Sequence, residues 1–130
     1  MALPITATYA ALLAIVGIAL SMGVGAARGK TKVSLGDGGE PLLIVRNRRH
    51  MNFVENVPMA LILIGLIEAN GGGATLLHSL GGVLLAARII HPFGLDIENM
   101  AKLTRFVGAM ATMLVILVSA GWLLWNAFGR

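Results

Sequence analysis

Three polar residues stand in a regular row directly before a long apolar stretch. Arg48, Asn52 and Glu55 follow one another at spacings of four and three residues, just ahead of the apolar run 57–67. In a helix these spacings place all three side chains on one face, because each residue turns the chain by about 100°. The row, called the polar row below, presents a guanidinium that can bind a carboxylate of a ligand through two hydrogen bonds.

The depth of this row in a membrane favours a functional interpretation. The apolar run 57–67 is shorter than the roughly 20 residues that cross a bilayer core, so the span must include the polar row. Ionisable groups at such depth face a bundle interior or a cavity and mark functional sites. We therefore expect a polar pocket, open to the cytoplasm, into which Arg28, Arg88 and Arg105 reach from three other helices.

The charged residues also allow two other interpretations, of which the first stays open and the second is not favoured. The row is also consistent with a structural cluster, in which Arg48 neutralises Glu55 and docks helices in register. A metal site is not expected, because His50, His78 and His91 share no ligand spacing.

The composition indicates an integral membrane protein. Of 130 residues 57% are hydrophobic and 12% are charged, about half the charged fraction of a soluble domain. The chain has no cysteine, so any thiol chemistry requires a thiol carried by a ligand. We expect one domain, residues 1–130, with an all-α fold.

Four apolar spans are predicted, at about residues 3–27, 46–69, 74–91 and 101–128. A glycine-rich polar connection follows the first span, a tight Asn70-Gly-Gly-Gly turn follows the second, and Pro92 with Gly94 ends the third. The first run lacks a preceding positive segment and is too long for a signal peptide, so we interpret it as an uncleaved span.

The basic residues predict the orientation of the four spans. Nine of the ten Lys and Arg residues fall beside the first and third connections, and only Arg130 lies beside the other membrane face. By the positive-inside rule these two connections are cytoplasmic and both termini lie outside. Lys30, Lys32, Arg46 and Lys102 are assigned to topology and to anionic lipid headgroups. The net charge of +4 therefore needs no nucleic-acid partner.

The polar row resembles a motif of the MAPEG family, the membrane-associated proteins in eicosanoid and glutathione metabolism. The matching residues are Arg48-x-x-x-Asn52-x-x-Glu55-x-x-Pro58 in the second span. Further matches are Arg28, Asp37-Gly38-Gly39, Ala87-Arg88-x-x-His91 and Arg105-x-x-Gly108. The resemblance extends over nearly the whole chain and is strongest to the small bacterial branch.

The resemblance implies a bacterial inner-membrane homotrimer that binds glutathione as a cosubstrate between neighbouring subunits. The polar row would hold the peptide backbone of glutathione, and Arg105 would lie near its sulfur as the catalytic residue. The other residues implied to bind glutathione are Arg28, His50, Arg88 and His91, of which His50 matches a histidine of the microsomal glutathione transferase branch.

The chemistry of arginine limits what this site would do. A guanidinium stays protonated, so Arg105 would stabilise the glutathione thiolate, whose unperturbed thiol pKa is about 8.5, rather than accept its proton. Eicosanoid-type relatives have tyrosines where this chain has Asn56 and His91, so leukotriene synthesis is disfavoured. The expected activity is transfer of glutathione to a lipophilic electrophile or reduction of a hydroperoxide. The alternatives are a non-enzymatic membrane binding module and a structural subunit of a larger membrane complex.

Overall fold

The computed structural model describes residues 2–95, 97 and 102–129. Four long helices form the fold: α1 (Pro4–Thr31), α2 (Pro41–Ala69), α3 (Ala74–Ile90) and α4 (Leu103–Phe128). A short 3-10 helix, η1 (His91–Gly94), extends α3. All four helical regions are long and apolar enough to cross a membrane. The predicted all-α, four-span architecture is therefore confirmed.

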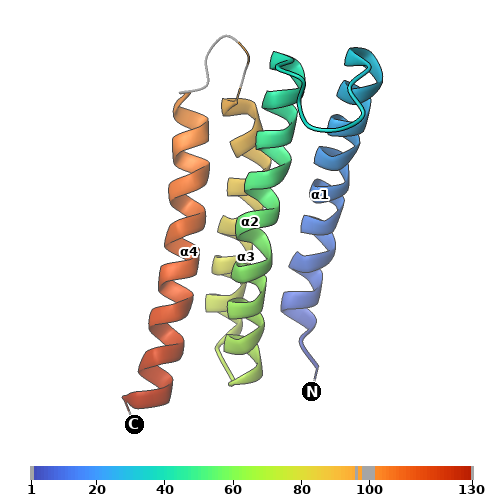
Figure 1. Ribbon diagram of the computed structural model, residues 1–130. Coiled ribbons are helices and arrows are strands. Elements are labelled where there is room, and N and C mark those ends of the chain that lie inside the picture. The colour runs from blue at the N-terminus through green and yellow to red at the C-terminus, as the bar shows by residue number, and fades with distance from the viewer. Residues whose placement is uncertain (1, 96, 98–101, 130) are drawn as a thin grey trace.

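The helices run alternately up and down, as Figure 1 shows, so both termini lie at the same end of the bundle. The ends of α1 and α3 and the starts of α2 and α4 lie at the other end. We call this second end the basic end, because nine of the ten Lys and Arg residues belong to it or to its connections. Helices α2 and α3 each pack against all the other helices, and α1 and α4 lie on opposite sides of them.

The core follows a single face of α2. Val57, Ala60, Ile64 and Ile67 recur at spacings of three and four residues and are all buried. This spacing is that of one helix face, and burying it away from solvent holds the bundle together. The residues that complete the core come from the other three helices: Leu13, Leu77, Leu80, Leu84 and Val115.

A carboxylate from α2 caps the start of α1. The Glu68 Oε1 and Oε2 atoms accept hydrogen bonds from the backbone N–H groups of Ile5, at 3.0 Å, and Thr6, at 2.7 Å. These groups belong to the first turn of α1, where the helix itself offers no acceptor and where a negative charge is favoured. No local pattern marks Glu68 for this role, because its partners lie more than sixty residues away along the chain.

Two helix boundaries at the basic end differ from those predicted. Helix α1 continues to Thr31 rather than to residue 27, and α2 begins at Pro41 rather than at residue 46. Proline suits the first turn of a helix because it needs no backbone donor there, and Leu43 and Val45 are buried. The connection is thus limited to residues 32–40.

Candidate functional site

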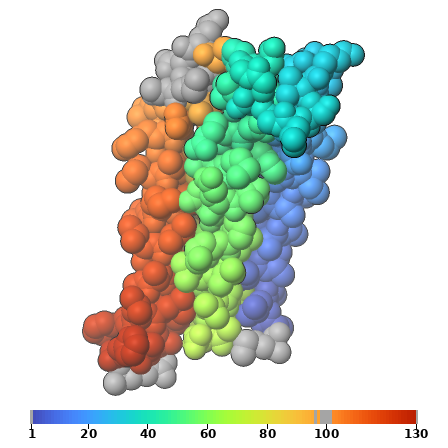
Figure 2. Space-filling view, in the orientation of Figure 1, coloured from blue at the N-terminus to red at the C-terminus, as the bar shows by residue number. Residues whose placement is uncertain are grey.

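The polar row lies on the outer face of α2. Arg48 and Glu55 are exposed and Asn52 is half-buried. Ile64 follows Glu55 by nine residues, about half a turn around the helix axis, and is fully buried in the core. Figure 2 shows that one face of α2, in green, is uncovered between α1 and α4.

The expectation that the polar row faces a pocket within its own bundle is therefore wrong. Apolar residues such as Val57 and Ile64 occupy the core face of α2, so the charged residues are left on the opposite face. Within the described part of the chain, neither Arg48 nor Glu55 makes a hydrogen bond or an ion pair. The ion pair between Arg48 and Glu55, which the structural-cluster interpretation requires, is likewise not formed within the described part of a single chain.

Arg88 has become a buried bridge between three helices. Its side chain is only 2% exposed, and its Nη1 donates a hydrogen bond to Asn52 Oδ1 on α2 at 2.7 Å. Its Nη2 donates to the Gly108 carbonyl on α4 at 2.8 Å, an oxygen that also accepts the Thr112 hydroxyl at 2.9 Å. Arg88 therefore fixes the orientation of Asn52, the central residue of the polar row.

Two glycines bring α3 and η1 into direct contact with α4. A Cβ atom at Gly108 would lie 2.8 Å from the Ala87 carbonyl oxygen and 2.8 Å from the His91 Cβ, which leaves no room for a side chain. Gly94 packs in the same way against the backbone of Arg105. Half-buried Arg105 is thus held at the start of α4, close to buried His91.

Other residues of the predicted site lie apart from the polar row within one chain. Arg28 closes the connection that follows α1, because its Nη1 donates to the carbonyls of Val33, at 3.2 Å, and Gly36, at 2.9 Å. His50 is half-buried on α2, about 160° around the helix from Arg48. The chain itself brings together Arg88 with Asn52 and His91 with Arg105, but leaves Arg28 and His50 elsewhere.

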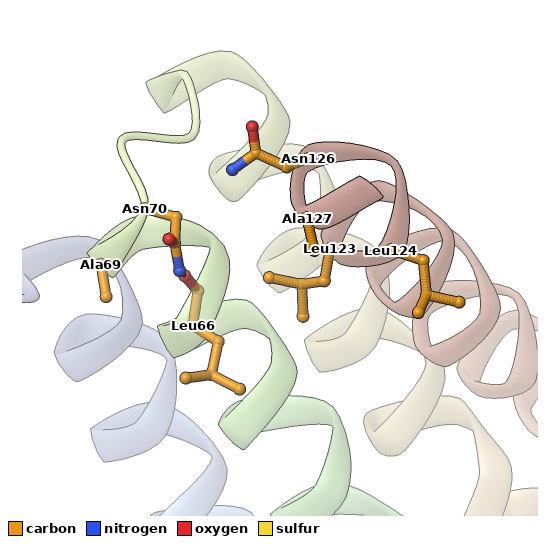
Figure 3. Close-up of a pocket in the computed structure, with 7 residues that line it drawn as sticks. All are labelled: Leu66, Ala69, Asn70, Leu123, Leu124, Asn126 and Ala127. Atoms are coloured by element: carbon orange, nitrogen blue, oxygen red, sulfur yellow. The ribbon is translucent and has the colours of Figure 1, made fainter. Parts of the chain in front are cut away.

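A pocket lies at the end of the bundle opposite to the basic end. It has a volume of about 620 Å³ and opens between the end of α2 and the end of α4 (Figure 3). Among the described residues that line it, Asn70 and Asn126 are the polar side chains and none is ionisable. Catalysis needs ionisable or nucleophilic groups, so the polar row is the stronger candidate.

Comparison with known proteins agrees with the four-span fold. The model of the MAPEG family matches residues 6–125. The inner membrane protein YecN of Escherichia coli K12 is 38% identical over 90 residues, which cover 69% of each chain, and the YecN of a second E. coli strain gives the same values. No solved structure matches the chain significantly. The family match spans all four helices, and the chain therefore belongs to the MAPEG family.

Proposed function

We propose that the protein is a glutathione-dependent transferase or peroxidase of the bacterial inner membrane, with glutathione held on the polar row between two copies of the chain. The observation that carries this proposal is the absence of partners for Arg48 and Glu55 among the described residues, on the outer face of a membrane-spanning helix. Charged groups facing lipid are costly. A second copy of the chain and a polar ligand would together remove this cost, which supports an oligomer, and the family resemblance implies three copies.

Glutathione fits the polar row in length and in charge. The row runs seven residues along α2, or about 10.5 Å at 1.5 Å per residue, and an extended tripeptide is about 10 Å long. Glutathione has two carboxylates and one ammonium group, which match the Arg48 guanidinium, a second arginine and the Glu55 carboxylate. Because Asn52 Oδ1 already accepts from Arg88, the amide nitrogen of Asn52 is left to donate to the peptide.

The reaction follows from a cation near the glutathione sulfur. Arg105 would favour the thiolate over the thiol, with the released proton passing to solvent. The thiolate would then attack an electrophile from the bilayer, forming a thioether as the leaving group departs or the activated bond opens. With a hydroperoxide it would attack the terminal oxygen, breaking the O–O bond to give an alcohol, after proton uptake from solvent, and glutathione sulfenic acid. A second glutathione would convert the sulfenic acid into glutathione disulfide and water. Arg28 and His50 would reach this site from a neighbouring copy, because neither lies beside the polar row of its own chain.

We expect Arg105→Gln to lower turnover of a chromogenic electrophile at pH 7 by up to about tenfold for each unit by which the thiol pKa rises. The loss should shrink as the pH is raised toward 9, because deprotonation then no longer depends on the guanidinium. Glutathione affinity should change little. The measurement is kcat against pH in detergent, with Lys102→Gln as the charge control.

Two outcomes would contradict the enzymatic part of the proposal. Saturable glutathione binding without turnover of any electrophile or hydroperoxide would favour the membrane binding module. Purification in a fixed complex with another membrane protein, without glutathione binding, would favour the structural subunit. If the dependence of kcat on pH is unchanged in Arg105→Gln, Arg105 does not stabilise the thiolate.

We also propose that the basic end faces the cytoplasm and that both termini lie outside it. The name of the relative, inner membrane protein YecN, supports the membrane, and the nine cationic residues at the basic end support the orientation. Alkaline phosphatase, which is active only outside the cytoplasm, should be active when fused after Arg130 and inactive when inserted after Gly38. The reverse pattern would overturn this orientation.

A further inference from the structure

A second cationic site lies in a groove between α1 and α3 near the basic end. The groove has a volume of about 360 Å³. Apolar side chains form its walls, among them Ile15 and Ala19 from α1 and Phe93 from η1, and the guanidinium-bearing residues Arg46, Arg49 and Arg88 complete it. No acidic residue is among those that line it.

This groove is separate from the polar row. Arg46 precedes Glu55 by nine residues, which places the two side chains about 180° apart around α2. Arg46 therefore points toward α1 and α3, as its place in the groove confirms, whereas Glu55 is exposed on the outer face. A ligand in the groove would not occupy the proposed glutathione site.

Two of the groove's cations, Arg46 and Arg88, have donors that the described chain does not satisfy. The Nε atom of buried Arg88 has no hydrogen-bond partner, although both its Nη atoms are bonded. Arg46 makes no hydrogen bond or ion pair with the described residues, while Arg49 donates to the Leu95 carbonyl. Unpaired guanidinium donors beside apolar walls are costly, so they favour an anion that brings its own oxygen atoms.

The apolar surface around the cations indicates which anion this is. Ile15 is 66% exposed and Phe93 is 73% exposed, although both line the groove. A small soluble anion would leave these side chains uncovered, whereas a lipid would cover them with its acyl chains. A volume of about 360 Å³ lies at the lower limit for ligand pockets, which suits a headgroup whose chains continue outside.

We propose that this groove is a binding site for an anionic phospholipid, with the headgroup phosphate on Arg46, the buried charge of Arg88 behind it, and an acyl chain along α1 and η1. The site does not depend on the proposed glutathione chemistry. It also differs from the general attraction of basic residues to a membrane surface, because only the arginines on the groove side of α2, and not those on its outer face, would bind the lipid.

The test is to count retained lipids by native mass spectrometry after delipidation and addition of defined lipids. Phosphatidylglycerol should bind at one tight site per chain, and phosphatidylcholine with the same acyl chains should bind at least about tenfold more weakly. Excess inorganic phosphate should not displace the lipid. Displacement by phosphate alone would show that the cations bind any phosphate and that the apolar walls contribute nothing.

Matched variants separate the groove from surface charge. Arg46→Gln should weaken phosphatidylglycerol binding by roughly tenfold, and Ala19→Phe should weaken it similarly by filling the groove without changing charge. Arg48→Gln removes the same charge two residues away on the outer face and should change binding by less than about twofold. Elution volume in gel filtration verifies that each variant is folded.

Three results would overturn the proposal. Equal losses in Arg46→Gln and Arg48→Gln would show general surface attraction. Undiminished binding in Ala19→Phe would exclude the groove. The absence of a tight lipid in the unaltered protein would show that a neighbouring copy or water satisfies the arginines instead.

Discussion

Replacing Arg88 by alanine is expected to lower the free energy of unfolding by about 3 kcal/mol. The substitution breaks the hydrogen bonds to Asn52 Oδ1 and to the Gly108 carbonyl, and interhelical bonds of this kind contribute up to about 1.7 kcal/mol each. It also leaves a cavity at a fully packed position, which adds to the loss. Removing the unpaired Nε atom offsets part of this cost.

Tryptophan fluorescence during denaturant unfolding would measure this change. Both tryptophans lie in α4, and Trp122 packs against the core, so its signal reports the docking of α4. Arg48→Ala is the matched control, since exposed Arg48 makes no hydrogen bond with the described residues and should cost less than about 0.5 kcal/mol. Similar small losses in both variants would show that Arg88 is not a structural bridge.

Glutathione binding should depend strongly on Arg48 and Glu55, the two exposed charged residues of the polar row, although they contribute little to stability. Arg48→Ala and Glu55→Gln should each weaken binding by roughly tenfold to a hundredfold, because a hydrogen bond to a charged group contributes about 1.5–3 kcal/mol. Stability in the absence of glutathione should change little, since both side chains are exposed in the single chain. The outer face of α2 would then be a binding surface rather than a structural one.

Isothermal titration of glutathione into the detergent-solubilised protein would measure these affinities. Lys30→Gln is the control, because it removes the same charge at the basic end and lies outside the polar row. If Lys30→Gln loses as much affinity as Arg48→Ala, the loss in Arg48→Ala reflects net charge and not a specific contact. Full affinity in both Arg48→Ala and Glu55→Gln would exclude the polar row as the glutathione site.

The architecture was predictable because membrane spans have a strong local signal. Long apolar runs and the placement of lysine and arginine gave four helices and one basic end, and the structure has both. The start of α2 was placed five residues too late, at residue 46 instead of Pro41. A short apolar segment that includes Leu43 and Val45 follows the polar connection and was assigned to it. This segment is helical because both side chains are buried against other elements, which the local sequence does not reveal.

The orientation of the site was harder to predict than its residues. Helical spacing correctly placed the polar row on one face of α2. It does not indicate whether that face points toward the core of its own bundle or toward another copy of the chain. Arg88 was predicted to bind glutathione, and in the single chain its guanidinium donates to Asn52 and to the Gly108 carbonyl, an arrangement that helical spacing alone does not predict. Nothing in the local sequence distinguishes an arginine that donates to a carbonyl twenty residues away from one that binds a carboxylate of glutathione.

The most direct test of the central claim, that the polar row binds glutathione, is the unfolding free energy of the purified protein as glutathione is added. A ligand that binds only the folded state at a concentration of 100 times its Kd stabilises it by about 2.7 kcal/mol. We expect such a rise in the unaltered protein and a rise of at most about 1.4 kcal/mol in Glu55→Gln at the same glutathione concentration, because the Kd of the variant is tenfold to a hundredfold higher. No rise in the unaltered protein, or the same rise in the variant, would contradict the account.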